Sequence, residues 1–417
     1  MTSRLLEGLR VVELAEVWAG PMAGSLFGDL GADVVKVESY PRNSQTRTLV
    51  EAAGRTTTAE GPPYERSAIH HLANRNKRNI ALNLRDERSV EPFRRLVARA
   101  DLVFESYSAG TLKGMGWGWD VIRGINPRAV MISAPGWGDR GPYQGYVTLG
   151  SGLDASSGHT SVRGYPGDPP EDTRPIFHSD ATGALTIVFA AVAALRRRES
   201  SGAGCFVDIS QIEALTWQLP GLLGEWTMNS RVAPPLGNAD PHVVPHDVYR
   251  ALGEDSWVFV AAEDDAQWSG LARLIGHGDW AEHGHDFASV VGRLRGRSEI
   301  DRAIADFAGT RSAFEVADAV QAAGAIAAPA VASSEFMASE QIMARGWLQP
   351  VTHRYAGTNL MPGFLWSVAP DPPTWDRPAG LVGEHNGEVL TELGFSEAEI
   401  EALERDGVIG NRYALPA

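Results

Sequence analysis

The chain has 417 residues, 43% hydrophobic and 21% charged, a composition typical of a globular protein long enough for two domains. Its 37 basic and 52 acidic residues give a net charge of -15, which argues against nucleic acid or an anionic membrane as a general partner. The single cysteine, Cys205, excludes an intrachain disulfide and fits a reducing compartment. Glu7 and Glu13 interrupt what would be a signal sequence, and no apolar run reaches about 18 residues, so we expect a cytoplasmic protein.

The first half of the chain alternates between strand and helix patterns. Strand patterns lie at 10–14, 33–38, 79–84, 102–105, 129–133 and 205–209, and helical patterns lie at 21–30, 91–100, 110–116, 119–125 and 181–195. Because a helical crossover between strands implies parallel pairing, we predict an α/β fold with an open, doubly wound sheet and helices on both faces. Cys205 falls in a predicted strand, which favours a core position over a reactive thiol.

The second half of the chain changes in composition. A polar loop over 158–174 precedes the helix at 181–195, and a Pro-rich linker occupies 233–245. A hairpin is predicted over 248–260, helical patterns continue to about 323 and again over 335–348, and two amphipathic helices fall within 381–409. We therefore expect a large domain over 1–232, a small domain over 233–333 and a C-terminal segment over 334–417.

Asp180 stands at the start of the long apolar helix that Arg196, Arg197 and Arg198 close. In one interpretation its carboxylate caps the helix by accepting N–H bonds near Thr182 or Gly183. In the other, the same donors and the positive helix end keep an exposed carboxylate ionised, as a nucleophile requires. Taken alone, the local sequence favours the cap.

The turn between the first two strands invites comparison with a dinucleotide-binding motif, because it is rich in glycine and Glu38 ends the second strand. The segment from Gly20 to Gly24 does not reproduce G-x-G-x-x-G, however, and Pro21 removes an N–H donor. An NAD-dependent oxidoreductase is therefore disfavoured. What remains is a helix N-terminus with backbone donors at Ala19 and Gly20 that could serve an acyl oxyanion or a phosphate.

Basic and imidazole side chains gather at two further places. Arg75, Lys77 and Arg78 lie together in NRNKRN, which predicts either a solvated face or, with Arg42 and Arg47, a phosphate site. His159 and His178 have no Cys or carboxylate at metal-ligand spacing, so we predict no metal site. If His178 and Asp180 lie on a strand end, alternation turns both side chains the same way, and the imidazole would tune the carboxylate or serve as a second acid/base. The pattern favours the alternative, a hydrogen-bonded loop histidine.

Six segments in order resemble the family III CoA-transferases, also called the CaiB/BaiF type, which include formyl-CoA and carnitine CoA-transferases and 2-methylacyl-CoA racemases. They are LEGLRVVELAEVWAGPMAGSLFGDLGADVVKVE, NRNKRNIALNL, ADLVFESYSAGTLKGMGWGWDVIRGINPRAVMISAPGWGDRGPY, HSDATGA, SGAGCFVDIS and VGEHNGEVLTELGFSEAEIEAL. The resemblance implies that the C-terminal segment returns to a large Rossmann-like domain, that the small domain is α+β, and that two chains form an interlocked homodimer. Some members work as unlike pairs, so a related partner subunit is an alternative.

The resemblance also implies the site residues. Asp180 matches the catalytic aspartate. Matches to residues that contact CoA are Val17, Trp18 and Ala19 near the thioester, Asn74, Arg75 and Lys77 near the phosphates, Ser106 and Tyr107 near the adenine, and Gly136 and Trp137 on a further turn. Gly114 and Ser39 stand where other members have arginine, so Lys113, Arg42 or Arg47 would bind phosphate instead. The glycine-rich loop of formyl-CoA enzymes is missing around Gly237 and Asn238, which puts the oxalate/formyl pairing in doubt.

The resemblance implies a CoA-transferase that moves CoA from an acyl-CoA to a free carboxylic acid through an anhydride and a thioester on Asp180. CoA is then a substrate, and no permanently bound cofactor or metal is required. The alternative is a racemase in which Asp180 and a histidine exchange the α-proton of an acyl-CoA. The Gly-His-Asp segment of racemases has no histidine counterpart in 147–158, which leaves His159 and His178 as stand-ins. A silent partner subunit is a further alternative, disfavoured by the presence of Asp180.

Overall fold

The computed structural model describes residues 4–48, 61–173, 176–369 and 372–413. The chain divides into two compact units: a large one of Met1–Thr160, Arg174–Arg231 and Gly346–Ala417, and a small one of Ser161–Thr173 and Val232–Arg345. This division differs from the predicted boundaries in two places. Part of the polar loop before Asp180 belongs with the small unit, and the chain returns to the large unit after Arg345 rather than after residue 333.

The large unit is built on one six-stranded sheet with the order β3-β2-β1-β4-β5-β6, and every neighbouring pair is parallel. The strands are β1 (Arg10–Leu14), β2 (Asp33–Ser39), β3 (Arg78–Leu82), β4 (Leu102–Glu105), β5 (Val130–Ser133) and β6 (Phe206–Asp208). The predicted doubly wound sheet is confirmed. Cys205 directly precedes β6 and is half-buried against the core.

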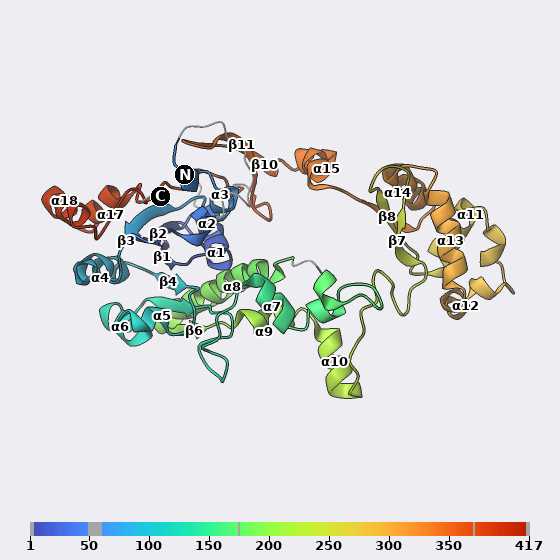
Figure 1. Ribbon diagram of the computed structural model, residues 1–417, viewed down its shortest axis with the longest axis horizontal. Coiled ribbons are helices and arrows are strands. Elements are labelled where there is room, and N and C mark those ends of the chain that lie inside the picture. Colours follow the sequence, from blue (N-terminus) through green and yellow to red (C-terminus); the bar gives the residue numbers. More distant parts are fainter. Residues whose placement is uncertain (1–3, 49–60, 174–175, 370–371, 414–417) are drawn as a thin grey trace. The chain divides into compact units, whose positions relative to one another are not determined.

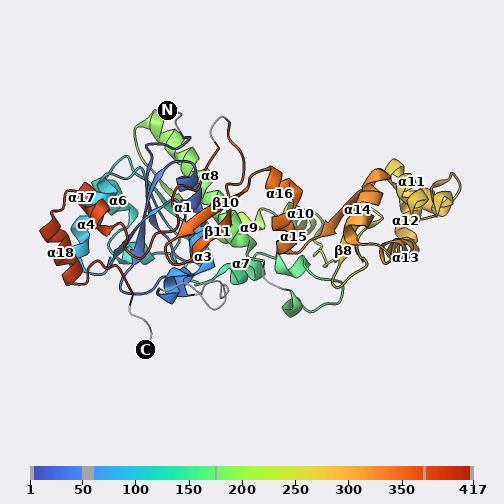
Figure 2. The same cartoon turned by 90° about the horizontal axis from the view of Figure 1, so that it is seen from above.

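Helices cover both faces of this sheet because the strands are apolar on both sides. One face packs on α1 (Ala19–Asp29) and α8 (His178–Ser201), and the core there includes Val11, Phe104 and Ile187. The other face packs on α4 (Val90–Ala98), α6 (Trp119–Ile125) and α17 (Asn386–Glu392), with α18 (Glu397–Arg405) beyond them. Figures 1 and 2 show the two groups of helices on opposite sides of the blue strands.

The large unit has further helices of four to ten residues among its described residues. They are α2 (Gln45–Thr48), α3 (Ala68–Ala73), α5 (Thr111–Gly114), α7 (Gly150–Ser156), α9 (Gln211–Thr216) and α10 (Pro220–Asn229). A two-stranded antiparallel hairpin, β10 (Leu348–His353) with β11 (Gly357–Pro362), belongs to the same unit.

The small unit has its own core and a three-stranded antiparallel sheet in the order β7-β8-β9. Its elements are β7 (His246–Arg250), β8 (Trp257–Ala261), β9 (Ile326–Ala330), α11 (Asp265–Leu274), α12 (Val290–Arg295), α13 (Arg297–Ala308), α14 (Ala313–Ala322), α15 (Ser333–Ala338) and α16 (Glu340–Ala344). The hairpin predicted over 248–260 is confirmed as β7 and β8. The single helix predicted over 335–348 is wrong, because the backbone is extended at Ser339, whose side chain caps α16.

Among the described residues, α8 is the one helix whose length and composition would suffice to cross a membrane. Half of its apolar window is buried in the large unit, as is usual for the core helix of a globular protein. Its exposed positions include Leu185, Phe189 and Val192, which recur at helical spacing along one face.

Candidate active site

A cavity of about 340 Å³ opens at the carboxyl edge of the six-stranded sheet. Residues that follow β1, β4 and β5 line it, including Glu16, Ser106 and Gly136. The order of strands reverses between β1 and β4, so the chain leaves these two strands toward opposite faces and a crevice forms between the connections. This is the position at which doubly wound folds bind their ligands.

Asp180 lines this cavity from the first turn of α8. The interpretation that its side chain caps the helix is wrong, because Phe177 occupies the cap position and makes no side-chain cap bond. The carboxylate instead accepts a hydrogen bond from the backbone N–H of Ala19, at the start of α1. Asp180 is also buried rather than exposed, and burial raises the pKa of its carboxyl to about 6, with a smaller contribution from the charge of Asp154.

Two strained residues flank this contact. Val17 has φ 66° and Phe177 has φ 56°, in the left-handed region that side chains other than glycine rarely adopt. Val17 lies two residues before the N–H donor of Ala19, and Phe177 directly precedes α8. The ring of Phe177 also packs near that of Trp18, the residue after Val17, with ring centroids 5.8 Å apart. Backbone strain of this kind concentrates at functional sites, where the surrounding structure maintains it.

Helix α7 closes the other side of the carboxylate through Gly150. A Cβ at this position would lie 2.3 Å from Asp180 Oδ2, so only glycine allows the approach. The hydroxyl of Ser179 donates to the carbonyl oxygen of Gly150 at 3.2 Å, and the N–H of Phe177 donates to Asp154 Oδ2 at 3.1 Å. The two residues Phe177 and Ser179 therefore attach the start of α8 to α7 directly before Asp180.

Six of the residues assigned to CoA by resemblance line this cavity together with Asp180: Val17, Trp18, Ala19, Ser106, Tyr107 and Gly136. Trp137 does not line it. Its ring packs against Tyr146, which does, at a centroid distance of 6.0 Å, and Trp137 itself lines a neighbouring cavity. The structure thus brings six of the seven residues predicted to contact CoA from the turns after β1, β4 and β5 into one cavity.

The basic cluster at NRNKRN lies away from the lining of this cavity. Arg75 donates to both carboxylate oxygens of Asp29 and stacks on Trp375, 4.8 Å from the ring centroid. Asn74 accepts from Lys77 Nζ at 3.1 Å and donates to the carbonyl oxygen of His70. All three predicted phosphate ligands are buried and none lines the cavity, because their charges and amides pair inside the protein.

Lys77 belongs to a buried network beneath the turn that precedes α1. Glu13 forms ion pairs of 2.8 Å with both Lys77 and Lys36, and all three side chains are almost completely buried. Lys36 also donates to the carbonyl oxygen of Ala15, and Lys77 to that of Pro21. These carbonyls lie on either side of Ala19, so the network fixes both ends of the turn that supplies its N–H. Burial lowers the pKa of Lys77 to about 7.

Of the three alternative phosphate ligands, Arg42 alone lines the cavity. Its guanidinium is largely exposed and bonds Glu16 at 2.8 Å. Arg47 is completely buried, donates to Glu38, Glu65 and the carbonyl oxygen of Gly380, and does not line the cavity. Lys113 is exposed on α5, away from the lining.

The structure also bears on two other predictions from the sequence, those for Glu38 and His178. Glu38 pairs with Arg47 and is buried, which leaves no free carboxylate for a ribose at that strand end. His178 lies on α8 rather than on a strand, and residues two apart on a helix do not face the same way. Its ring packs near that of His159, with centroids 4.8 Å apart, and neither histidine lines the cavity. No group of metal-binding side chains occurs among the described residues.

Sequence reasoning missed Gly150 and Glu105. Glu105 ends β4 directly before the lining residues Ser106 and Tyr107, accepts from the hydroxyl of Ser133 and accepts the N–H of Tyr107 at 2.7 Å. Burial raises the pKa of its carboxyl to about 7. An acidic residue ending an apolar strand was the available signal for Glu105, whereas nothing in the local sequence marks Gly150.

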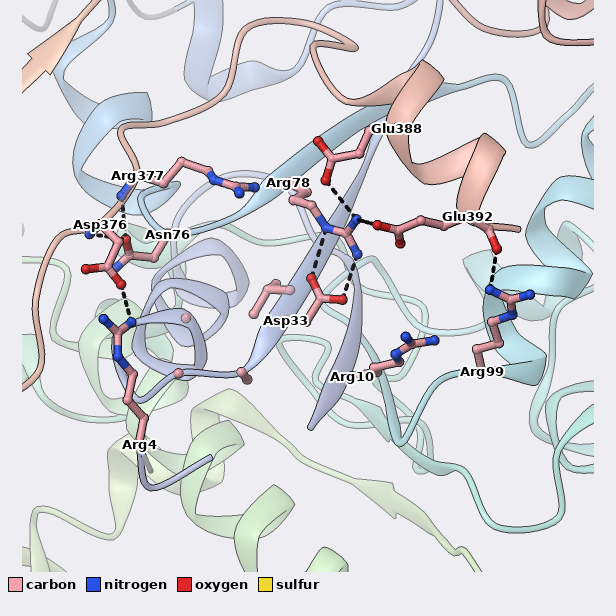
Figure 3. Close-up of a pocket in the computed structure, with 14 residues that line it drawn as sticks. Arg4, Arg10, Asp33, Asn76, Arg78, Arg99, Asp376, Arg377, Glu388 and Glu392 are labelled. Atoms are coloured by element: carbon pink, nitrogen blue, oxygen red, sulfur yellow. Dashed lines mark hydrogen bonds and ion pairs between the residues drawn. The ribbon is translucent and has the colours of Figure 1, made fainter. Parts of the chain in front are cut away.

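A larger cavity, of about 530 Å³, lies at the opposite edge of the sheet, where β1, β2 and β3 begin. Figure 3 shows Arg78 at its centre, bonded to Asp33, Glu388 and Glu392 at 2.6 to 3.0 Å. Arg4 pairs with Asp376 on the other side. The charges here join the C-terminal segment to the strands, and the lining offers no nucleophile comparable to Asp180.

A doubly wound sheet with a buried carboxylate at its switch point defines an α/β enzyme that binds its substrate at the carboxyl edge. The family model described as CoA-transferase family III matches residues 6–386, and the chain belongs to this family. It is an acyl-CoA:carboxylate CoA-transferase, with acyl-CoA as substrate.

Similar proteins cover nearly the whole chain. The succinyl-CoA–D-citramalate CoA-transferase of Chloroflexus aurantiacus is 29% identical over 97% of this chain and 98% of its own. The formyl-CoA:oxalate CoA-transferase of Streptomyces coelicolor is 29% identical over 98% of this chain and 100% of its own. A CaiB/BaiF family protein of Brucella suis has a solved structure that superposes with a TM-score of 0.82, at 27% identity over 94% of this chain and 100% of that chain.

Proposed function

We propose that Asp180 carries first the acyl group and then CoA during transfer. Its carboxylate attacks the donor thioester carbonyl, the C–S bond breaks, and CoA leaves as a thiolate, which produces a mixed anhydride. The thiolate then attacks the carbonyl carbon of Asp180 and releases the donor acid, leaving an aspartyl-CoA thioester. The acceptor carboxylate displaces CoA through a second anhydride, and the thiolate attacks the acceptor carbonyl to regenerate Asp180.

The observation that carries this proposal is the environment of Asp180. The carboxylate is buried at the switch point, and its one described hydrogen-bond donor is a backbone N–H. A pKa of about 6 leaves the group largely ionised at neutral pH, while partial desolvation keeps it more reactive than a carboxylate in water. Burial also limits hydrolysis of an anhydride by water.

The N–H of Ala19 has a second role in this mechanism. It donates to the carboxylate in the resting protein and lies where negative charge develops when the adduct forms, so it supports the oxyanion. Gly183, the other donor considered from the sequence, lies inside α8, where its N–H belongs to the helix. We assign the oxyanion role to Ala19 alone.

We place CoA along the turn 17–19 and the polar part of the cavity. Ser106, Ser108 and Thr111 supply hydroxyl groups there, and Arg42 supplies a largely exposed guanidinium at the same side. Arg42 replaces Asn74, Arg75, Lys77 and Arg47 as the phosphate contact in this assignment, because those four side chains are buried and occupied.

Racemisation on the same fold needs a histidine that faces the acyl α-carbon. No histidine is among the described residues that line the cavity. Incubation with an acyl-CoA in D2O distinguishes the two reactions, because rapid α-deuteration without an acceptor acid would contradict transfer as the principal activity.

We propose that the enzyme works as an interlocked homodimer. Leu185, Phe189 and Val192 form an exposed apolar stripe on α8, and Trp226 and Met228 on α10 are exposed as well. Apolar surface of this kind is usual at subunit interfaces. Light scattering of the purified chain tests the stoichiometry, and Phe189→Asp should shift the protein toward the monomer.

The covalent mechanism is tested by incubating the protein with a panel of acyl-CoA thioesters without acceptor. Hydroxylamine or borohydride then traps the activated carboxyl, and mass spectrometry locates the modified peptide. We expect modification at Asp180. If no donor modifies this residue while transfer proceeds, the covalent proposal fails.

A further inference from the structure

The cavity at Asp180 has two chemically different halves. One half, which we call the polar half, is lined by Glu16, Arg42, Gln45, Ser106, Ser108 and Thr111. The other, which we call the apolar half, is lined by Tyr146, Val147, Leu149 and Leu153; Thr148 lies in the same segment, and Gln211 also lines the cavity. Gly150 follows this second segment and is within contact distance of the carboxylate, so Asp180 faces the apolar half. The acyl group on the reacting carbon must therefore lie against these side chains.

Charge in the cavity is unevenly distributed. Among the described residues that line the cavity, Arg42 is the one base, and it pairs with Glu16 in the polar half. The described residues of the apolar half include no cation, and the charge of the buried Asp154 lies close enough to disfavour ionisation of Asp180. A second carboxylate on the acyl group would enter this half without a partner and next to two acids, which is costly in a desolvated site.

The apolar side chains at this edge are also unusually exposed. Val147 is 80% exposed, Tyr146 58% and Leu149 56%, although all three border a cavity. Tyr143 continues the surface, since its ring lies 4.9 Å from that of Tyr146. Exposed apolar patches beside a reactive group are typical of a surface that a ligand covers.

We propose that the acids exchanged by this enzyme are apolar monocarboxylates, with an aromatic or branched aliphatic group packed against Tyr146, Val147 and Leu149. This inference rests on the proposed covalent role of Asp180. It separates the chain from the two relatives described above, whose names specify the dicarboxylates succinate, citramalate and oxalate and, as the one monocarboxylate, the small formyl group.

Donor preference tests the inference. We compare phenylacetyl-CoA and isobutyryl-CoA with succinyl-CoA, and measure both kcat/KM for transfer and the trapped modification of Asp180. The expected result is a kcat/KM at least about 100-fold higher for the apolar donors, because succinyl-CoA leaves an unpaired charge in the site. Equal or better use of succinyl-CoA, with Asp180 still modified, would overturn the substrate class and leave the covalent role intact. Failure of every donor to modify Asp180 would overturn both.

A charge placed in the apolar half gives an independent test. Leu149→Arg adds a cation at an exposed position that lines the cavity, so it should raise the succinyl-CoA to phenylacetyl-CoA ratio by about tenfold. Val121→Arg is the matched control, because Val121 is exposed on α6 and does not line the cavity. Circular dichroism verifies that both variants fold. An unchanged ratio in folded Leu149→Arg would contradict the placement of the acyl group.

Discussion

The two edges of the large sheet differ in how they use charge. At the amino edge, Arg78 binds Asp33, Glu388 and Glu392, so a wide cavity is lined by groups that largely neutralise one another. At the carboxyl edge, a smaller cavity has two buried carboxylates: Glu16 pairs with Arg42, whereas the described hydrogen-bond partner of Asp180 is an uncharged backbone N–H. The comparison shows that neither the volume of a cavity nor its number of charges indicates chemistry. A buried acid without a cationic partner is the more informative feature.

Replacing the acid at the carboxyl edge should have the largest effect. Asp180→Asn retains the shape of the side chain and removes the nucleophile, so we expect transfer to fall by roughly 10⁴-fold or more. Steady-state rates with an active donor and acceptor measure this loss. Circular dichroism and the oligomeric state serve as controls for folding. Activity within tenfold of wild type would exclude Asp180 as the nucleophile.

Adding one methyl group beside the acid should have the next largest effect. In Gly150→Ala the new Cβ meets Asp180 Oδ2, so the carboxylate must move from the Ala19 N–H, and we expect roughly a 10- to 100-fold loss in kcat. Gly145→Ala is the matched control, because a Cβ there has nothing within 4 Å. Equal activities of the two variants would show that the close approach at Gly150 is unimportant for catalysis.

Low pH should inactivate the enzyme by protonating the carboxylate of Asp180. With a pKa of about 6, roughly nine-tenths of Asp180 is ionised at pH 7 and one-tenth at pH 5, so the acylation rate should fall about tenfold between them. Single-turnover modification by a donor measures this step without the later ones. A rate independent of pH over this range would contradict the raised pKa.

The same raised pKa has an opposite effect on stability. Below about pH 3 the acid is protonated in both folded and unfolded chains, and as pH rises toward 6 the unfolded chain ionises first. The cost to folding grows over this range and reaches about 3 kcal/mol above pH 6 for a shift of this size. Urea unfolding should show Asp180→Asn gaining stability relative to wild type between pH 4 and 7.

A change at the amino edge should affect stability and leave chemistry nearly unaltered. Arg78→Met removes the cation shared by three half-exposed carboxylates, so we expect a loss of about 1–2 kcal/mol in the free energy of unfolding. The kcat of the folded variant should remain within twofold of wild type. A selective loss of kcat, with stability retained, would show that this edge takes part in the reaction.

The strand pattern was enough to predict the sheet, because buried parallel strands are nearly continuous apolar runs. Asp180 and the turn at 17–19 were found through family resemblance, and the structure brings them to one cavity. The positions of Arg75 and Lys77 in the basic cluster could not be predicted from the sequence. Arg75 pairs with Asp29 and Lys77 with Glu13, and the local sequence does not indicate partners so distant along the chain.

The prediction that Asp180 caps its helix was wrong for a different reason. Capping preference assumes that the helix begins at the polar residue, whereas the left-handed Phe177 starts α8 earlier and places Asp180 inside the first turn. Gly150 was missed because its role depends on how closely α7 approaches α8, a tertiary distance with no local pattern.

The ion pairs among Lys36, Glu13 and Lys77 have a consequence for how activity is lost. The two lysines also donate to the carbonyl oxygens of Ala15 and Pro21. The N–H of Ala19 is therefore oriented before the thioester binds, and the reaction requires little backbone reorganisation. Since these charges are buried in the sheet core, the turn cannot loosen while the core stays intact. Catalytic competence and the folded state should then disappear over the same range of denaturant.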